Sequence, residues 1–329
     1  MIYPGGLAHR NAAGEWQIFN TDNSGLPDNG VNALLLDNKG GLWVGTSAFS
    51  GKEGLAYRTV TGDWDILKTD LSGLPSNEIN TLIEDNNGGL WIGTAALDQG
   101  GGHLTHYTAT NEWHLIDNAP NPEIKTLLSD NNGGIWIGTW GSGIIHRNAT
   151  GERVIFNTEN SALPSNHITS LISDSQGGLW IGTSAFLTEG GLAHRDASGN
   201  WRIFKTNNSD LPDNNIYALL ADDNQGIWIG TLHGLAHHSA TGEWRVFNQD
   251  NSGLPDNQIK VLLSDNKKGI LVGTHKGGLA HRTANGDWRI FNTDNSEMPH
   301  NEIKSLLSDD NDGLWIGTWG GGLLHYTAK

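Results

Sequence analysis

The chain has 329 residues, of which 36% are hydrophobic and 17% are charged, with 45 glycines and 14 tryptophans. This composition excludes a long helical bundle or coiled coil and a disordered chain. The formal charge of −16 would repel a phosphate polymer, so we do not expect nucleic acid as a partner. No apolar run approaches 18 residues, no signal-peptide pattern opens the chain, and no cysteine is present, so membrane insertion, disulfides and thiolate sites are not expected.

A short glycine-rich string divides the chain into repeats. The pattern G-[LI]-[WL]-[IV]-G-T occurs at 41–46, 89–94, 134–139, 178–183, 226–231, 269–274 and 313–318, which we number as repeats 1 to 7. Intervals of 43 to 48 residues with glycine-rich turns are typical of β-propellers.

Each repeat holds four strand-like runs, which we name A to D in chain order. In repeat 1 they are residues 31–37 (A), 42–46 (B), 54–58 (C) and 63–67 (D). Turn-forming residues between A and B and between C and D predict antiparallel hairpins. Runs A and B are apolar on both faces, which predicts sheets packed between other sheets, and no helical periodicity appears.

The ends of the chain predict how the last repeat is completed. Repeat 7 lacks a D run, which residues 15–19 can supply. Two C-like runs, 5–10 and 321–326, then compete for one position, and we expect 321–326 to fill it because a short turn leads there from run B. The prediction is an all-β, seven-bladed β-propeller of four-stranded antiparallel blades, a single domain over 1–329, with a ring closed by N- and C-terminal strands sharing one blade. We expect a monomer, with strand exchange through the spare terminal strand as an alternative.

The repeat also resembles a known family. The pattern L-P-x-N-x-[IV]-x-x-L-[LI]-x-D-x-x-G-x-[LI]-W-[IV]-G-T, as in 74–94 and 163–183, is similar to the two-component regulator propeller repeat. The resemblance implies the ligand-binding sensor part of a hybrid histidine kinase, located in the periplasm or outside the cell. The repeats are unusually alike, as in 5–29 and 277–301, which favours recent amplification or deliberate engineering.

Differences in loop length point to one face of the predicted propeller. The A-to-B and C-to-D spacings are constant in every repeat, whereas the B–C segments are long at 47–53, 95–101 and 184–190, and the D–A segment is short at 117–123. Loops on a rigid scaffold commonly carry binding sites, so we expect a ligand at the face of the D–A and B–C loops. Neutral drift of tolerated insertions is the alternative.

The positions of the tryptophans select two candidate ligand-binding residues on this face. Twelve recur at equivalent positions of runs B and D, where we expect core packing. Trp140 and Trp319 do not; both lie in B–C loops beside glycine, where an indole offers a flat platform for a sugar ring or another apolar ligand face. A hydrophobic lid over the blade edge is the alternative.

Further candidate ligand-binding residues surround Trp140. The short D–A loop lies between two long B–C inserts, which predicts a notch bordered by Asp98, Gln99 and Phe186. Lys125, with Lys260 and Lys304 at the same position of run A, would favour an anionic ligand. Solvated side chains at a channel rim are the alternative.

The sequence shows no motif that assigns catalysis, a metal or a cofactor. Seven histidines share one position of run C and are expected to pack or hydrogen-bond: His9, His106, His146, His194, His237, His281 and His325. The aspartates of D-x-x-G lack calcium-loop spacing and are expected to cap their own turns: Asp37, Asp85, Asp130, Asp174, Asp265 and Asp309. No catalytic signature occurs. The scattered candidates for acid–base chemistry are His167, His233, His275 and His300.

The sequence therefore favours a non-catalytic, sensor-type propeller that binds a small molecule or glycan on the D–A and B–C loop face. An engineered or recently amplified scaffold without a specific ligand is one alternative. A propeller-type polysaccharide lyase or hydrolase is another.

Overall fold

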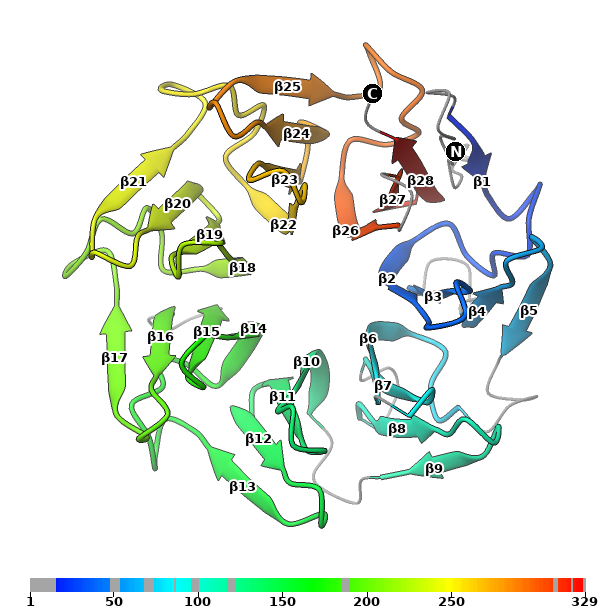
Figure 1. The fold of residues 1–329 in the computed structure, drawn as a ribbon, viewed down its shortest axis with the longest axis horizontal. Helices are drawn as coiled ribbons and strands as arrows, with labels where there is room; N and C mark the ends of the chain where they lie inside the picture. The colour runs from blue at the N-terminus through cyan, green and yellow to red at the C-terminus, as the bar shows by residue number, and fades with distance from the viewer. Residues whose placement is uncertain are drawn as a thin grey trace. The chain divides into compact units, whose positions relative to one another are not determined.

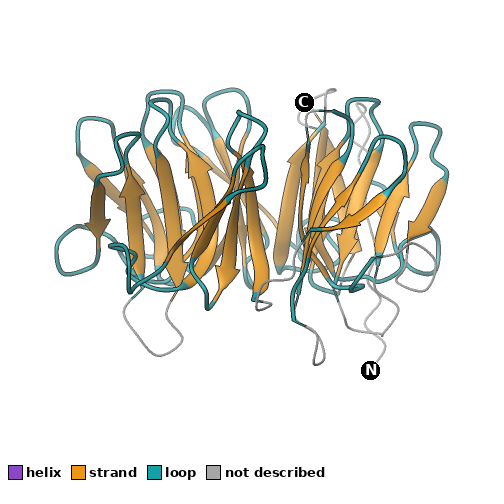
Figure 2. Ribbon diagram, turned by 90° about the horizontal axis from the view of Figure 1, so that it is seen from below, coloured by secondary structure: helices purple, strands orange, loops and turns teal. Residues whose placement is uncertain are grey.

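The computed structural model describes residues 16–47, 54–67, 74–85, 87–95, 101–116, 122–184, 190–309 and 313–320, and the backbone of 322–327. All regular secondary structure in these residues is β-strand (Figure 2). The structure therefore confirms the all-β prediction and has a propeller-like arrangement of small antiparallel sheets.

The strands follow the predicted runs closely. Repeats 1 to 4 form β2 (Val31–Leu36), β3 (Leu42–Thr46), β4 (Leu55–Arg58), β5 (Trp64–Leu67), β6 (Ile79–Glu84), β7 (Leu90–Thr94), β8 (Leu104–Tyr107), β9 (Trp113–Leu115), β10 (Glu123–Ser129), β11 (Ile135–Trp140), β12 (Ile144–Arg147), β13 (Arg153–Phe156), β14 (His167–Ser173), β15 (Leu179–Ser184), β16 (Gly191–Arg195) and β17 (Trp201–Phe204). Repeats 5 to 7 form β18 (Ile216–Ala221), β19 (Ile227–Thr231), β20 (Gly234–His238), β21 (Trp244–Phe247), β22 (Ile259–Ser264), β23 (Ile270–Thr274), β24 (Leu279–Arg282), β25 (Trp288–Phe291), β26 (Ile303–Ser308), β27 (Gly313–Thr318) and β28 (Gly322–Thr327).

Within each repeat the strands pair in chain order (Figure 1). β2–β5, β6–β9, β18–β21 and β22–β25 are separate four-stranded sheets. β10–β17 form one eight-stranded sheet, because a single backbone pair between Trp140 and His167 joins β11 to β14. The predicted hairpins A–B and C–D are therefore present.

The remaining sheet joins the two ends of the chain. Its order is β1-β28-β27-β26, and β1 (Ile18–Phe19) pairs antiparallel with β28 through Ile18 with Leu324 and Phe19 with Leu323. Within the described residues, Ile18–Phe19 of the predicted run 15–19 complete repeat 7 and the C-terminal copy of run C fills the contested position, as predicted. The competing run at 5–10 lies outside the described residues.

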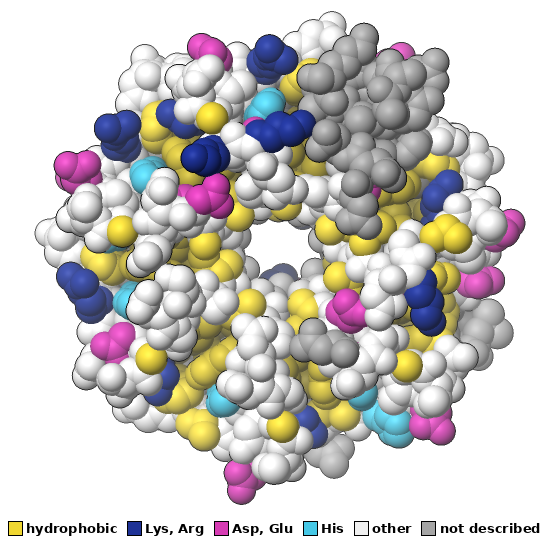
Figure 3. All heavy atoms as spheres, in the orientation of Figure 1, with side chains coloured by type: hydrophobic (Ala, Val, Ile, Leu, Met, Phe, Trp, Pro, Cys, Tyr) yellow, Lys and Arg dark blue, Asp and Glu magenta, His cyan; other side chains and the backbone are white. Residues whose placement is uncertain are grey.

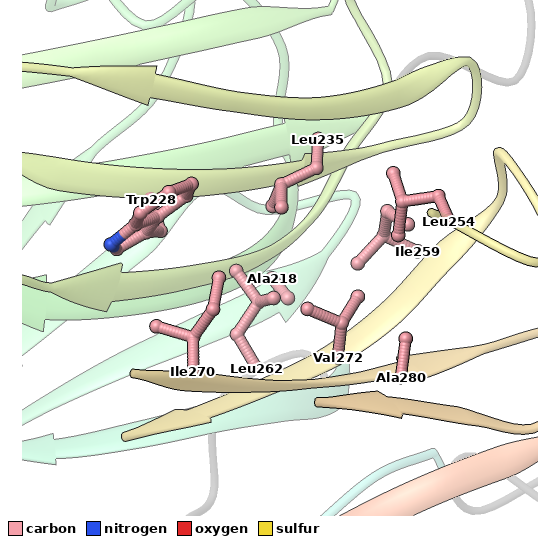
Figure 4. Close-up of a cluster of buried hydrophobic side chains, with 9 residues drawn as sticks. All are labelled: Ala218, Trp228, Leu235, Leu254, Ile259, Leu262, Ile270, Val272 and Ala280. Carbon is pink, nitrogen blue, oxygen red and sulfur yellow. The ribbon is translucent and has the colours of Figure 1, made fainter. Parts of the chain in front are cut away.

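The chain divides into two compact units, Met1–Ile124 with Phe291–Lys329 and Lys125–Ile290. In both, the hydrophobic core lies between neighbouring sheets. In the second unit, Figure 4 shows side chains of β18, β19 and β20 meeting those of β22, β23 and β24, with Trp228, Ile259 and Val272 buried among them. In the first unit, Phe19 and Trp315 pack with Val31 and Leu42.

The glycine of the G-T pair permits this close packing of sheets in six of the seven repeats. A Cβ on Gly230 would lie 2.6 Å from Cγ2 of Ile259 in the next repeat, and one on Gly45 would lie 2.5 Å from Cγ2 of Ile79. These distances are shorter than any van der Waals contact. The recurring Gly is therefore required by the approach of the next A strand, not by backbone conformation.

A polar bridge recurs near the A–B turns of repeats 1 to 6. In repeat 5, Asp222 Oδ1 accepts hydrogen bonds from the N–H groups of Asn224 and Gly226, and Oδ2 lies 2.6 Å from His237 Nε2. Equivalent pairs join His106 to Asp85, His146 to Asp130, His194 to Asp174 and His281 to Asp265, while Tyr57 replaces histidine on Asp37. The predicted turn-capping and hydrogen-bonding roles are confirmed for these described residues, and Asp222, which the D-x-x-G pattern missed, has the same role.

Candidate functional site

Trp140 and Lys125, which the sequence selected separately, lie in contact. Trp140 ends β11 and Lys125 is the third residue of β10, and Lys125 Nζ is 5.5 Å from the centroid of the Trp140 ring. The ring of His167 meets the same indole edge-on at 4.6 Å between centroids. The site therefore combines a cation, an indole and an imidazole at one strand end.

Trp319 has an equivalent partner in repeat 7. Lys304 Nζ lies 4.0 Å from the centroid of the Trp319 ring and 3.7 Å from Glu302 Oε1. Trp319 N–H donates to the carbonyl of Glu302, which fixes the start of the loop, and the residue is 37% exposed. The same lysine–tryptophan pairing thus occurs in both repeats that carry the additional tryptophan.

The third lysine of this position has a different aromatic partner. Lys260 Nζ lies 5.0 Å from the ring centroid of Tyr217 in the preceding repeat. Burial raises the pKa of the Tyr217 hydroxyl, and the negative charge of Asp213 raises it further. All three lysines therefore contact aromatic rings instead of extending freely into solvent.

The other predicted site residues cannot be placed. Asp98, Gln99 and Phe186, and residues 117–121 of the short D–A loop, lie outside the described residues. The notch beside Trp140 accordingly stays a prediction.

Of the four scattered histidines, His233 has the geometry of an acid–base group. Its Nδ1 lies 2.6 Å from Asp213 Oδ2, and its side chain is 65% exposed. His167 Nδ1 is 3.3 Å from Ser165 Oγ, and His300 Nδ1 accepts the N–H of Glu302, so these two serve local turns. His275 N–H donates to the carbonyl of Gln258. Among the residues with described side chains, no three His, Asp or Glu groups lie close enough to hold a metal ion.

Two cavities open at the other ends of the strands, beside the A–B and C–D turns. One, of about 370 Å³, lies between β2–β5 and β6–β9 and is lined by Trp43, Tyr57, Asp65, Tyr107 and other residues. The second, of about 270 Å³, lies between β18–β21 and β22–β25 and is lined by Trp228, Arg245, Phe247 and Arg282 among others. The sequence analysis missed both, because it compared loop lengths and these turns are uniform in length.

Charge does not separate into large fields on the surface that Figure 3 shows. Acidic and basic side chains alternate there, with hydrophobic side chains visible between them. No helix in the described part of the chain is long and apolar enough to cross a membrane.

Comparison with known proteins identifies the repeat. The family described as two component regulator propeller matches residues 25–48, 73–96, 118–141, 162–185, 210–233 and 297–320. Six of the seven repeats therefore match the two component regulator propeller family. The matched segments of these regulator propeller repeats run from the end of the D–A loop through strand B, so they include Trp140 and Trp319. No curated protein matches the chain.

Several solved structures share the fold of this chain. The extracellular domain of the putative hybrid two component system BT3049 from B. thetaiotaomicron is 23% identical with a TM-score of 0.78, over 92% of this chain and 40% of that one. Virginiamycin B lyase from Staphylococcus aureus is 12% identical with a TM-score of 0.73, over 92% and 96% of the two chains. PorZ of Porphyromonas gingivalis, a surface component of the type-IX secretion system, is 16% identical with a TM-score of 0.71, over 95% and 48%. The regulator propeller repeats described here thus span less than half of the first and third of these chains.

Proposed function

We propose that the chain is a non-catalytic, sensor-type propeller in which the seven repeats close a ring of four-stranded blades around a ligand-binding face. The pairing of β1 with β28 supports closure, because it completes the last repeat with the first residues of the described chain. The match of six repeats to the regulator propeller family supports the sensor role and a location in the periplasm or outside the cell. The chain acts as a monomer.

The ligand binds at the strand ends that carry Trp140 and Trp319. The observation that carries this proposal is the repeated pairing of an additional tryptophan with a lysine of strand A, at 5.5 Å in repeat 3 and 4.0 Å in repeat 7. Twelve tryptophans are explained by their recurrent positions, whereas these two extend beyond the G-T pair toward the loops. Asp98, Gln99 and Phe186, which lie outside the described residues, stay predicted ligand contacts.

The chemistry of the pairs favours a small molecule or glycan that carries an acidic group. An indole face stacks on the C–H face of a sugar ring, and an ammonium beside it binds a carboxylate. Uronic-acid oligosaccharides combine both features. Neutral sugars would use the indole alone and bind more weakly.

A binding screen with matched variants tests the proposal. Oligogalacturonides and malto-oligosaccharides are titrated by calorimetry into the parent chain and into Trp140→Ala and Trp319→Ala. We expect an oligogalacturonide to bind and each substitution to weaken it about tenfold, since aromatic anchors commonly contribute that much. Leu232→Ala is the control, because Leu232 follows the G-T pair of repeat 5 and Ala95 occupies the same position in repeat 2. Unchanged affinity in both tryptophan variants would remove the proposed platform.

A lyase or hydrolase is the second candidate, and His233 favours it. Asp213 Oδ2 holds Nδ1 at 2.6 Å, which leaves Nε2 as the outward atom of an exposed ring, the arrangement of an oriented general base. Incubation of the chain with a polysaccharide panel, followed by product analysis, tests this. Turnover that His233→Ala abolishes would replace the non-catalytic proposal.

A scaffold without a ligand is the third candidate. It is favoured by the close similarity of the repeats, as in 5–29 and 277–301, and by the lysines that already contact the two indoles. Absence of binding across the oligosaccharide panel, with a folded chain, would favour it over the sensor proposal.

A further inference from the structure

Three of the described grooves between consecutive sheets contain an arginine from the protein itself. In the groove between β18–β21 and β22–β25, the guanidinium of Arg282 lies 5.5 Å from the ring centroid of Trp228 and 5.2 Å from that of Phe247. Arg58 lies 5.9 Å from Trp315 and 5.3 Å from Phe19 in the same way. Such distances correspond to cation–π contacts.

Aromatic rings, and not carboxylates, hold these guanidinium groups. Arg195 lies 5.1 Å from the ring of Phe156, again between two consecutive repeats. The Nε atoms of Arg58, Arg195 and Arg282 are buried without a hydrogen-bond partner in the described part of the chain. In these three grooves the protein therefore fills a cation site with its own side chain.

Two described grooves depart from this pattern. His238 takes the arginine's register between β14–β17 and β18–β21, where its ring meets Phe204, and the other exception lies between β2–β5 and β6–β9. Tyr107 pairs with Leu90, the first residue of its B strand, as Arg282 pairs with Ile270, so tyrosine replaces the arginine at the same register. The rings remain: Trp43 lies 4.5 Å from Tyr57 and 5.8 Å from Tyr107, centroid to centroid. Beside them is the cavity of about 370 Å³.

The groove between β2–β5 and β6–β9 also differs in charge from the groove between β18–β21 and β22–β25. Asp65 pairs with Tyr57 as Arg245 pairs with His237, so a carboxylate stands where the other cavity has a guanidinium. Asp37 is a second carboxylate of the lining, and its Oδ2 lies 2.9 Å from the Tyr57 hydroxyl. The ammonium of Lys39, also part of the lining, offsets one of these two charges.

Burial and these carboxylates raise the pKa values of the neighbouring tyrosines. Burial, the hydrogen bond to Asp37, and the charges of Asp37 and Asp65 together raise the pKa of Tyr57 to about 12. Burial and the charge of Asp65 also raise the pKa of Tyr107. Asp65, which lines the cavity, therefore acts on both tyrosines that border it.

We propose that this cavity binds a small organic cation with a trimethylammonium group, held by Trp43, Tyr57 and Tyr107 and attracted by Asp65. Three electron-rich rings around a hollow with a neighbouring carboxylate suit a quaternary ammonium, which needs no hydrogen bonds. The site goes beyond the function proposed above, because it lies at the opposite strand ends from Trp140 and Trp319.

Calorimetric titration of the chain with choline and with 3,3-dimethylbutan-1-ol tests the proposal. The two molecules have the same shape, but the alcohol replaces the charged nitrogen by carbon. We expect choline to bind about tenfold more tightly, from cation–π attraction, and to weaken as salt is added. Equal affinities, or no binding of choline, would overturn the proposal.

Variants of Tyr107 locate the binding. Tyr107→Arg installs the residue that the repeat carries at Arg58, Arg195 and Arg282, so the chain keeps its fold and fills the groove with its own guanidinium; choline binding is then lost. Tyr107→Phe keeps the ring and the affinity, although it removes the hydroxyl that donates to Asn111. Choline binding that survives Tyr107→Arg, with both variants showing the parent unfolding curve, would contradict this location.

Two further experiments distinguish this cavity from the proposed glycan site and identify which molecule supplies the trimethylammonium group. Asp65→Asn should weaken choline several-fold, and Trp140→Ala should not change it, so failure here is distinct from failure of the glycan proposal. Sedimentation with phosphatidylcholine vesicles, sensitive to Tyr107→Arg, would assign the lipid head group as the source. Choline binding without vesicle binding would assign the free cation.

Discussion

His237 Nε2 lies 2.6 Å from Asp222 Oδ2, while the other oxygen of the same carboxylate accepts two backbone N–H groups of the A–B turn. The indole of Trp228 packs on this imidazole at 4.4 Å between centroids. One side chain thus connects the turn, strand C and the aromatic core. The arrangement recurs in the described parts of most repeats, so it is a source of stability common to the whole chain.

The first prediction concerns the stability of the fold at acidic pH. Partial burial alone would raise the pKa of Asp222, but the hydrogen bonds from His237, Gly226 and Asn224 outweigh it and lower the pKa below its usual value. Asp85, Asp130, Asp174 and Asp265 are shifted in the same direction for the same reasons. A carboxylate with a lowered folded-state pKa stabilises the fold above its unfolded value of about 4, and this contribution is lost as pH falls further.

Urea unfolding between pH 7 and pH 2.5 checks this. We expect the free energy of unfolding to fall steeply below about pH 4. Asp222→Asn should cost about 1 to 2 kcal/mol at pH 7, because an amide nitrogen cannot accept the imidazole N–H, and much less at pH 2.5. Asp223→Asn, at the exposed neighbouring position, is the control and should behave as the parent. A pH-independent cost at position 222 would contradict the assigned role.

The second prediction tests the contact between sheets. Gly230→Ala places a Cβ 2.6 Å from Cγ2 of Ile259, and we expect it to lower the free energy of unfolding by about 1 to 3 kcal/mol through overpacking. Ile259→Ala removes the clashing methyl group, so the double variant should lose less than the sum of the two single variants. Strict additivity in chemical denaturation would show that the two sites do not touch.

The third prediction concerns backbone strain in two A–B turns. Lys268 has a φ of +67° where Gly177 in repeat 4 has +78°. A side chain disfavours this region, so Lys268→Gly should stabilise the fold by about 0.5 to 1 kcal/mol. Gly177→Ala, the reverse change in repeat 4, should destabilise it. Thermal and urea unfolding measure both, and a loss of stability in Lys268→Gly would refute the explanation.

The fourth prediction concerns the Lys304 contacts. Lys304→Met removes the ammonium that lies 3.7 Å from Glu302 and 4.0 Å from the Trp319 ring. Glu302 is largely buried, so we expect a loss of about 1 to 2 kcal/mol, between the values of exposed and buried pairs. Adding Glu302→Gln should recover part of it. If Lys304→Met leaves the urea midpoint unchanged, the pair is not a structural contact.

The sequence predicted the strands well, because glycine-rich turns and the recurring G-T pair divide the chain at every repeat. It also predicted the completion of repeat 7, since only one run was available for β1. It missed Asp222, although Gln225 and Lys268 stand at the same turn position after Asp222 and Asp265, and the backbone there has a φ of +65° and +67°. A pattern records residue types, whereas the turn depends on conformation.

The candidate sites were less predictable. Lys125 and Trp140 were both named, but their contact depends on how β10 and β11 align, which spacing alone does not give. The cavity beside Tyr107 was missed for another reason. Its loops have the same length as in the other repeats, and it is distinguished by residue exchanges, tyrosine for arginine at position 107 and a carboxylate at Asp65.

Hydrogen–deuterium exchange in the presence of oligogalacturonide tests the proposed ligand-binding face most directly. The account predicts slower exchange of the backbone amides in residues 135–141 and 313–320, around Trp140 and Trp319, with the A–B and C–D turns unaffected. Protection confined to those turns, or no protection at saturating oligosaccharide, would contradict it.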